Sequence, residues 1–191
     1  MNPSQPESAA VNGEVISSLR IRAMQLEDLP AVQSIDRLSF ALPWPESSFR
    51  YELLENPRSL LRVAEVRQTD ERWLVVGEIV VWLVMDEAHI ATIAVHPDYR
   101  GNGIAQLLLV EALIVSITKG VHQVTLEVRE SNLIARKLYQ QFGFQVVGSR
   151  PRYYKDNDED ALIMTASGLD DQTLKWLESG GWQSASNLSK E

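Results

Sequence analysis

A glycine-rich loop between an apolar strand and a long apolar helix is the clearest candidate for chemistry in this sequence. Residues 95–105 read VHPDYRGNGIA, so the strand enters a tight loop that leads directly into the helix. The first N–H groups of a helix have no partner inside it, and the helix dipole places partial positive charge there. Glycine lets a ligand approach the backbone closely, and Arg100 adds a formal positive charge. The loop is therefore predicted to bind an anion such as a pyrophosphate.

This loop differs from two common phosphate-binding patterns. Gly101 and Gly103 could begin the dinucleotide fingerprint G-x-G-x-x-G, but Gln106 stands where the third glycine belongs. No Gly-Lys-Ser/Thr follows, so the loop is not a Walker loop either. The alternative interpretation is a tight strand-to-helix turn that binds no ligand.

The elements around the loop follow the pattern of a mixed α/β domain. Strands are expected at Leu19–Met24, Leu60–Val66, Leu74–Met85, His89–Val95, Val121–Val128, Gln145–Gly148 and Ala161–Thr165. Helices are expected from Glu27 to Ser39 and over Glu46–Leu54, Ile104–Thr118 and Asn132–Phe142. The order β-α-α-β-β-β-α-β-α-β-β predicts a single domain with a central twisted mixed sheet, flanked by helices.

Composition and charge limit the classes of protein that need to be considered. The 191 residues are 45% hydrophobic and 23% charged, as in soluble globular proteins. The absence of cysteine excludes disulfides, thiolate metal sites and a cysteine nucleophile. The net charge of −8 argues against direct, unspecific nucleic-acid binding. We expect no membrane span and no signal peptide, and hence a cytoplasmic protein.

The excess negative charge lies in the two ends of the chain. Residues 19–155 hold 16 acidic and 16 basic side chains, so they are balanced. Residues 1–18 are rich in Pro, Ser, Asn and Ala, which predicts a disordered lead-in. A folded domain is expected over 19–166. The acidic segment 167–191 contains Trp176 and Trp182 and is either a short docking helix or a frayed tail.

Three motifs, in order along the chain, resemble those of the GNAT superfamily of N-acetyltransferases. The run Arg100-x-x-Gly103-x-Ala105 resembles its acyl-CoA signature, Q/R-x-x-G-x-G/A. Residues 92–99 resemble its fourth strand, and 126–132 with 135–144 resemble its fifth strand and the helix that follows. The resemblance spans about residues 19–165 and implies the GNAT fold.

Further motifs resemble one subgroup, the ribosomal-protein-alanine N-acetyltransferases of the RimI type. They are LPWPESSF at 42–49, LEVRESN at 126–132, LYQQFGF at 138–144, RYY at 152–154 and EDALIM at 159–164. The resemblance implies transfer of acetyl from acetyl-CoA to the N-terminal α-amine of a protein. The implied acceptor is an N-terminal alanine of a small-subunit ribosomal protein. The disordered lead-in and the tail beyond about residue 166 depart from this subgroup's compact core.

The resemblance also implies roles for individual residues. Glu127 would be the general base, directly or through a water, and Tyr139 would protonate the departing CoA thiolate. Asn132 would hold the pantetheine arm, and Ile93–Val95 would supply an oxyanion donor. The residues implied in binding acetyl-CoA are Ile93, Ala94, Val95, Arg100, Gly101, Asn102, Gly103, Ile104, Ala105, Gln106 and Asn132. Without the resemblance, Glu127 reads as a surface carboxylate on an alternating strand, and Tyr139 as a core aromatic.

Candidates for acceptor binding are aromatic. Trp44, between two prolines, could wall the peptide entrance or anchor the first helix turn, and Tyr153 and Tyr154 could cover a small N-terminal residue. Glu46 and the acids of 156–160 could attract a basic peptide, although acid-rich turns are usually simply solvated. The three histidines (His89, His96 and His122) are scattered, so no metal site is expected.

Two other functions remain open at this point. A GNAT enzyme could instead act on a lysine side chain, a polyamine or a drug amine. A lysine amine has a pKa near 10.4 and makes heavier demands on the base than an α-amine. A protein of another class, a CoA-binding sensor or ribosome-associated module, would catalyse little. Since no cysteine can carry an acetyl group, an enzyme would use direct attack within a ternary complex.

Overall fold

The computed structural model describes residues 10–11, 14–15 and 18–183. Contacts between residues divide the chain into two compact units. The first comprises Met1–Val80 and Thr92–Leu109, and the second comprises Val81–Ala91 and Val110–Glu191. Strand β5 (Trp73–Val84), strand β6 (Glu87–Val95) and helix α3 (Ile104–Thr118) contribute residues to both. Most of the predicted lead-in at 1–18 lies outside the described residues.

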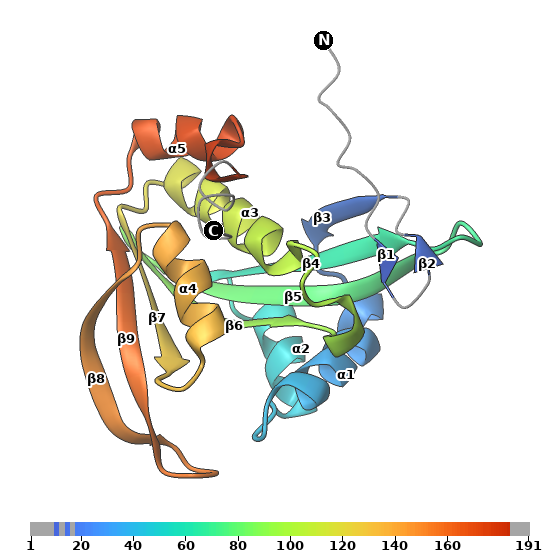
Figure 1. Cartoon of the computed structure of the whole chain (residues 1–191), viewed down its shortest axis with the longest axis horizontal. Helices are drawn as coiled ribbons and strands as arrows, with labels where there is room; N and C mark the ends of the chain where they lie inside the picture. Colours follow the sequence, from blue (N-terminus) through green and yellow to red (C-terminus); the bar gives the residue numbers. More distant parts are fainter. Residues whose placement is uncertain (1–9, 12–13, 16–17, 184–191) are drawn as a thin grey trace. The chain divides into compact units, whose positions relative to one another are not determined.

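The first unit contains the N-terminal half of the elements (Figure 1). They are β1 (Ala10–Val11), β2 (Glu14–Val15), β3 (Leu19–Ala23), η1 (Leu26–Asp28), α1 (Leu29–Ser39), α2 (Glu46–Leu54), β4 (Ser59–Arg67), part of β5 (Trp73–Val84) and of β6 (Glu87–Val95), η2 (Pro97–Tyr99) and the start of α3 (Ile104–Thr118). Strand β1 pairs antiparallel with β2, and β3 pairs antiparallel with β4.

A glycine within β5 lets the start of α3 approach the strand. A side chain at Gly77 would lie 3.1 Å from Leu108, 3.2 Å from the Ala94 carbonyl oxygen and 3.3 Å from Ile104. The residues of α3 that point to this place are fully or nearly fully buried. The absence of a Cβ therefore fixes how the helix that follows the glycine-rich loop sits on the sheet.

The second unit contains the rest of β5, β6 and α3, followed by the C-terminal elements. They are β7 (Gln123–Arg129), α4 (Leu133–Gln141), β8 (Gln145–Tyr154), β9 (Glu159–Ser167) and α5 (Asp171–Glu178). Strand β7 runs parallel to β6 and antiparallel to β9, and β9 runs antiparallel to β8. Residues alternate along β7 between buried and half-buried, so one face carries Val124, Leu126 and Val128 into the core.

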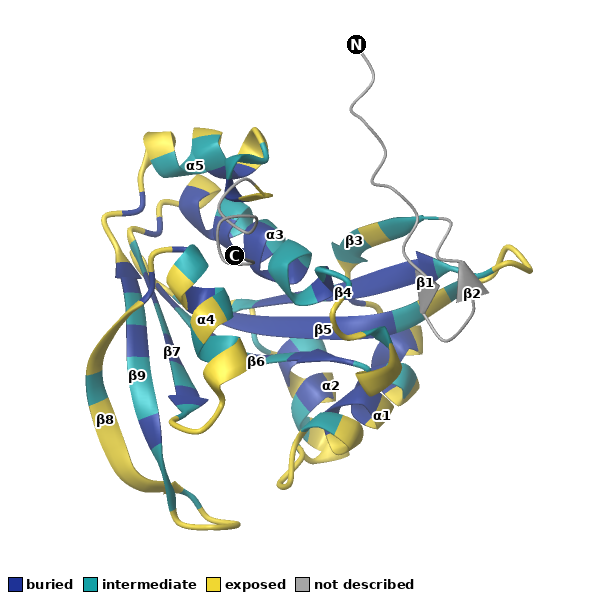
Figure 2. Cartoon of the chain, viewed as in Figure 1, coloured by how far each residue is buried: buried dark blue, intermediate teal, exposed yellow. Residues whose placement is uncertain are grey.

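The strand order β3-β4-β5-β6-β7-β9-β8 confirms the predicted mixed α/β fold with its βαβ unit. In Figure 2, β4 is dark along most of its length, whereas β8 is largely yellow because its residues are exposed. The predicted bounds of α2 and α3 agree with the structure. Strand β8 is longer than predicted and runs to Tyr154, with irregular register against β9.

Part of the C-terminal segment forms helix α5, and residues 184–191 of this segment lie outside the described residues. Helix α5 begins after Asp170, whose side chain accepts hydrogen bonds from the N–H groups of Gln172 and Thr173. The rings of Trp176 and Trp182 lie 6.2 and 6.1 Å from that of Phe142, which follows α4. Trp182 is 8% exposed.

Among the described residues, no helix has the length and apolar character needed to span a membrane.

Candidate active site

The glycine-rich loop has the backbone geometry that requires its glycines. Gly101 and Gly103 adopt φ angles of 82° and 74°, in the left-handed region where a side chain would be strained. The Asn102 side-chain amide donates hydrogen bonds to the carbonyl oxygens of Tyr99 and Arg100, both at 3.1 Å. The loop is thus fixed by its own side chains before any ligand is present.

Arg100 connects this loop to the elements around it. Its Nε donates to the Val95 carbonyl oxygen at 3.0 Å, and its Nη2 donates to Ser39 Oγ at 3.0 Å. Helix α3 follows, and its turn begins with the hydrogen bond from Leu107 N to the Gly103 carbonyl oxygen. The N–H groups before that bond belong to the helix N-terminus, the part of a helix that binds anions.

Strand β6 leads into this loop and is longer than its pairing with β7. The parallel register runs from Glu87 opposite Gln123 to Ile90 opposite Leu126, and β6 continues to Val95. The segment expected to contact pantetheine, Ile93–Val95, therefore follows the last residue that pairs with β7. The His96 N–H that ends the strand donates to the Val76 carbonyl oxygen at 2.8 Å.

Glu127, the predicted general base, lies in the second unit, held between two basic side chains. Its side chain is 8% exposed. Oε1 lies 2.9 Å from Nη2 of Arg150, and Oε2 lies 3.0 Å from Nε2 of His89. The imidazole of His89 in turn stacks on Trp82, with ring centroids 5.6 Å apart. Glu127 is therefore not a freely solvated surface carboxylate, because each of its oxygens contacts a basic side chain.

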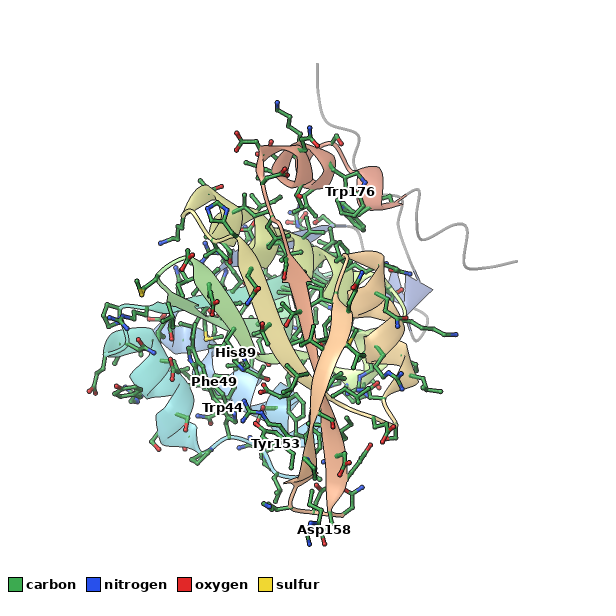
Figure 3. All side chains as sticks on the ribbon, turned by 90° about the vertical axis from the view of Figure 1, so that its left-hand side faces the viewer. Trp44, Phe49, His89, Tyr153, Asp158 and Trp176 are labelled. Atoms are coloured by element: carbon green, nitrogen blue, oxygen red, sulfur yellow. The ribbon has the colours of Figure 1, made fainter. Side chains whose placement is uncertain are left out.

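The two tyrosines that are predicted to bind the acceptor, Tyr153 and Tyr154, each contact the side chain of an arginine. The Arg150 guanidinium lies 5.6 Å from the ring of Tyr153, and the Arg129 guanidinium lies 3.9 Å from the ring of Tyr154. The two tyrosine rings meet edge to face at 5.3 Å. Burial raises the pKa of Tyr154 to about 12, so its phenol is neutral near pH 7. Figure 3 shows Tyr153 on β8, above the hairpin tip at Asp158.

Three of the four acids of the β8–β9 hairpin, Asp156, Glu159 and Asp160, have internal partners. Arg129 forms ion pairs with Asp156 at 2.7 Å and with Glu159 at 3.0 Å. Hydrogen bonds from Ser131 lower the pKa of Glu159 to about 2. The Arg152 N–H donates to Asp160 at 2.8 Å. These contacts favour a structural role for the acids over attraction of a basic peptide.

Tyr139 and Asn132 lie on and beside α4. Tyr139 is buried, with its ring 5.8 Å from that of Phe144. Asn132 does not continue the helix but caps it, because its side-chain oxygen accepts the Ala135 N–H at 3.1 Å. The helix predicted over Asn132–Phe142 is therefore observed over Leu133–Gln141.

Trp44 lies in the first unit, where its neighbours favour the anchoring interpretation. Its ring is 5.1 Å from that of Phe49, which is fully buried, and the two are labelled in Figure 3. Its backbone N–H donates to the buried carboxylate of Asp36 at 2.7 Å. These contacts fix the segment between α1 and α2.

Sequence reasoning missed His89 and Arg150. The alternation of β6 places His89 on a half-buried face, and the pairing of a histidine with a glutamate on the adjacent strand could have been considered. Arg150 carried no such signal, because the register of β8 shifts between Arg150 and Tyr154. The structure thus joins Glu127 with Tyr153 and Tyr154 in one cluster. The loop and Trp44 are in the other unit.

Comparison with known proteins identifies a family that matches this fold and its glycine-rich loop. Residues 29–144 match the model of the acetyltransferase (GNAT) family. The chain therefore belongs to the GNAT family of acetyltransferases, and the resemblance seen in its motifs is confirmed.

Two curated relatives and one crystal structure are informative. The chain is 42% identical over 144 residues to a Bacillus subtilis protein that is provisionally named a ribosomal protein bS18-alanine N-acetyltransferase. This match covers 75% of the chain and 92% of the relative. It is 35% identical over 147 residues to the Escherichia coli ribosomal protein bS18-alanine N-acetyltransferase, covering 75% and 94%. The crystal structure of the Escherichia coli enzyme superposes with a TM-score of 0.69 at 32% identity, covering 78% of this chain and 94% of that one.

Proposed function

We propose that this protein transfers an acetyl group from acetyl-CoA to the N-terminal α-amine of a protein, and that the acceptor is the N-terminal alanine of ribosomal protein bS18. The observation that carries the proposal is similarity over nearly the whole length of two relatives named for that reaction. Because the substrate would be a ribosomal protein, the proposed place of action is the cytoplasm.

The glycine-rich loop is proposed to bind the pyrophosphate of acetyl-CoA. Its two positive-φ glycines and the N-terminus of α3 support this assignment, because they present backbone N–H groups to an anion. The backbone of Ile93–Val95 is proposed to hydrogen-bond the pantetheine and to supply the oxyanion donor. Asn132 is proposed as a further pantetheine contact, in addition to its role as a helix cap.

The proposed reaction is a direct transfer. An α-ammonium group has a pKa of about 7.7 to 8.0, so little free energy is needed to deprotonate it near neutral pH. Glu127 accepts this proton, and the amine nitrogen then attacks the thioester carbonyl carbon. The C–N bond forms first, which gives a tetrahedral oxyanion. As this oxyanion collapses, the C–S bond breaks and Tyr139 donates a proton to the departing thiolate, while the attacking nitrogen releases its second proton to the tyrosinate or to solvent and becomes a neutral amide. The burial of the Glu127 side chain supports its role as a general base that is held in a fixed position.

Thiol release from acetyl-CoA in the presence of two peptides of equal charge tests the proposal. One peptide begins with a free alanine and a basic second residue, and the other has a blocked N-terminus and an internal lysine. We expect turnover with the first peptide alone. Turnover with the second alone would replace the N-terminal acceptor by a lysine side chain. With neither peptide active, but acetyl-CoA bound, the chain would be a CoA-binding module.

A substitution of the proposed base tests the mechanism. Glu127→Gln keeps the size and hydrogen-bonding capacity of the side chain but cannot accept the proton. We expect kcat to fall by about 10² to 10⁴-fold, the usual contribution of a general base, while acetyl-CoA binding is retained. A variant with wild-type turnover would exclude Glu127 as the base.

A further inference from the structure

We propose that His89 and Arg150 are positioning residues that hold the Glu127 carboxylate in the orientation needed to accept the amine proton. The proposal rests on the proposed function, in which Glu127 is the base. It adds two residues to which no role in the reaction had been assigned, both in the second unit of the chain.

The contacts divide evenly between the two carboxylate oxygens. Arg150 Nη2 is 2.9 Å from Oε1, and His89 Nε2 is 3.0 Å from Oε2. A carboxylate has about four lone-pair positions. Among the described residues each oxygen has one ion-pair partner, so a lone pair on each remains for an incoming proton.

Three different strands meet at this group. Glu127 is on β7, His89 is on the neighbouring parallel strand β6, and Arg150 is on β8, which is separated from β7 by β9. Within the β6–β7 register, His89 lies opposite Thr125, two residues before Glu127. The carboxylate is therefore held from both sides across the sheet, and rotation about the Glu127 side-chain bonds would break at least one contact.

The two partners are themselves held in place. The His89 ring stacks on Trp82, with an angle of 20° between the planes. Arg150 lies over Tyr153. The exposed fractions decrease from Arg150, at 55%, through His89, at 30%, to Glu127, at 8%. The partners thus cover the carboxylate from the solvent side and keep it in one conformation.

The catalytic consequence follows from geometry. A flexible glutamate must lose rotamer freedom before it can accept a proton in the transition state, and a misplacement of about 1 Å can cost on the order of 10²-fold in rate. The two contacts restrict that freedom before substrate binds. Their loss should therefore lower kcat and leave the KM for acetyl-CoA nearly unchanged.

The experiment compares disruptive with conservative substitutions at each position. His89→Leu and Arg150→Met remove the polar contact, whereas His89→Gln and Arg150→Lys retain an N–H donor near the carboxylate. We expect kcat to fall roughly 10-fold or more in the first pair, within the cost of misplacement, with the KM for acetyl-CoA changed less than about 2-fold. His89→Gln and Arg150→Lys should recover a large part of kcat.

Controls separate this inference from the proposed function and from a loss of structure. Thr125→Val removes a hydroxyl on the same strand that hydrogen-bonds Thr165; its kcat should stay near wild type. If Glu127→Gln is inactive while His89→Leu and Arg150→Met retain wild-type kcat, the positioning role is wrong and the base assignment stands. If Glu127→Gln is fully active, both are wrong. Conservative variants as impaired as the disruptive ones would also overturn the positioning role.

Discussion

Arg100 has two roles in the glycine-rich loop. Its Nε and Nη2 donate to the Val95 carbonyl oxygen and to Ser39, so the side chain fixes the loop as well as supplying positive charge. A phosphate-binding role inferred from charge alone would have missed this structural part.

We expect Arg100→Ala to raise the KM for acetyl-CoA about 10-fold, since a charge-assisted hydrogen bond contributes roughly 1.5 to 3 kcal/mol, and to change kcat less. Steady-state kinetics with acetyl-CoA varied at saturating peptide measure both quantities. Arg58→Ala, at an exposed position after α2, is the matched control. An unchanged KM in Arg100→Ala would show that the arginine does not contribute to acetyl-CoA binding.

Sequence reasoning located single residues well where the evidence was local. The glycines at 101 and 103 were identified correctly as positions of a tight turn, and their φ angles confirm it. The contacts of Glu127 could not be found in this way, because its partners are 38 residues before it and 23 residues after it in the chain. Only the pairing of strands brings these residues together.

At the scale of elements, helices were predicted more accurately than the last strands. The bounds of α2 and α3 agree with the prediction because proline precedes the first, while Gly103 directly precedes the second and Gly120 lies two residues after its end. Strand β8 continues beyond its predicted end to Tyr154 and contains an irregularity, where Arg152 adopts a φ of 51° and its N–H donates to the Asp160 carboxylate. A left-handed arginine stabilised by a residue of the next strand has no signature in the sequence.

Helix α5 and the segment after it are stabilised by aromatic packing. Trp182→Ala should lower the free energy of unfolding by roughly 3 kcal/mol, the usual cost of truncating a buried aromatic side chain. Trp182→Phe retains a ring against Phe142 and should lose clearly less. Chemical denaturation of both variants measures the difference. A Trp182→Ala variant as stable as wild type would mean that this segment does not contribute to the packing.

At the scale of the whole molecule, one buried acid should make stability depend on pH. Glu78 is fully buried on β5, and its Oε1 accepts a hydrogen bond from Thr92 at 3.1 Å. Its Oε2 has no hydrogen-bond partner among the described residues. Burial raises the pKa of Glu78 from 4.5 to about 8. The folded state therefore binds this proton more tightly than the unfolded state does.

The sign of the effect follows from that difference. The contribution of protonated Glu78 to the free energy of unfolding is fully present below pH 4.5 and is lost as pH rises through about 8. The glutamine of Glu78→Gln cannot ionise. The difference in the free energy of unfolding between this variant and wild type should therefore be larger at pH 9 than at pH 5, by on the order of a few kcal/mol. Glu71→Gln, at an exposed turn, is the control. Equal pH profiles for Glu78→Gln and wild type would contradict the prediction.

The contact of Trp176 and Trp182 with Phe142 also has a consequence for how the protein is made. Phe142 directly follows the helix that carries Tyr139, and its N–H donates to the Tyr139 carbonyl oxygen. Its aromatic neighbours lie 34 and 40 residues later in the chain. Because synthesis proceeds from the N-terminus, strands β1 to β9 are synthesised before this packing can be completed. The end of α4 therefore completes its packing only after Trp182 has emerged from the ribosome.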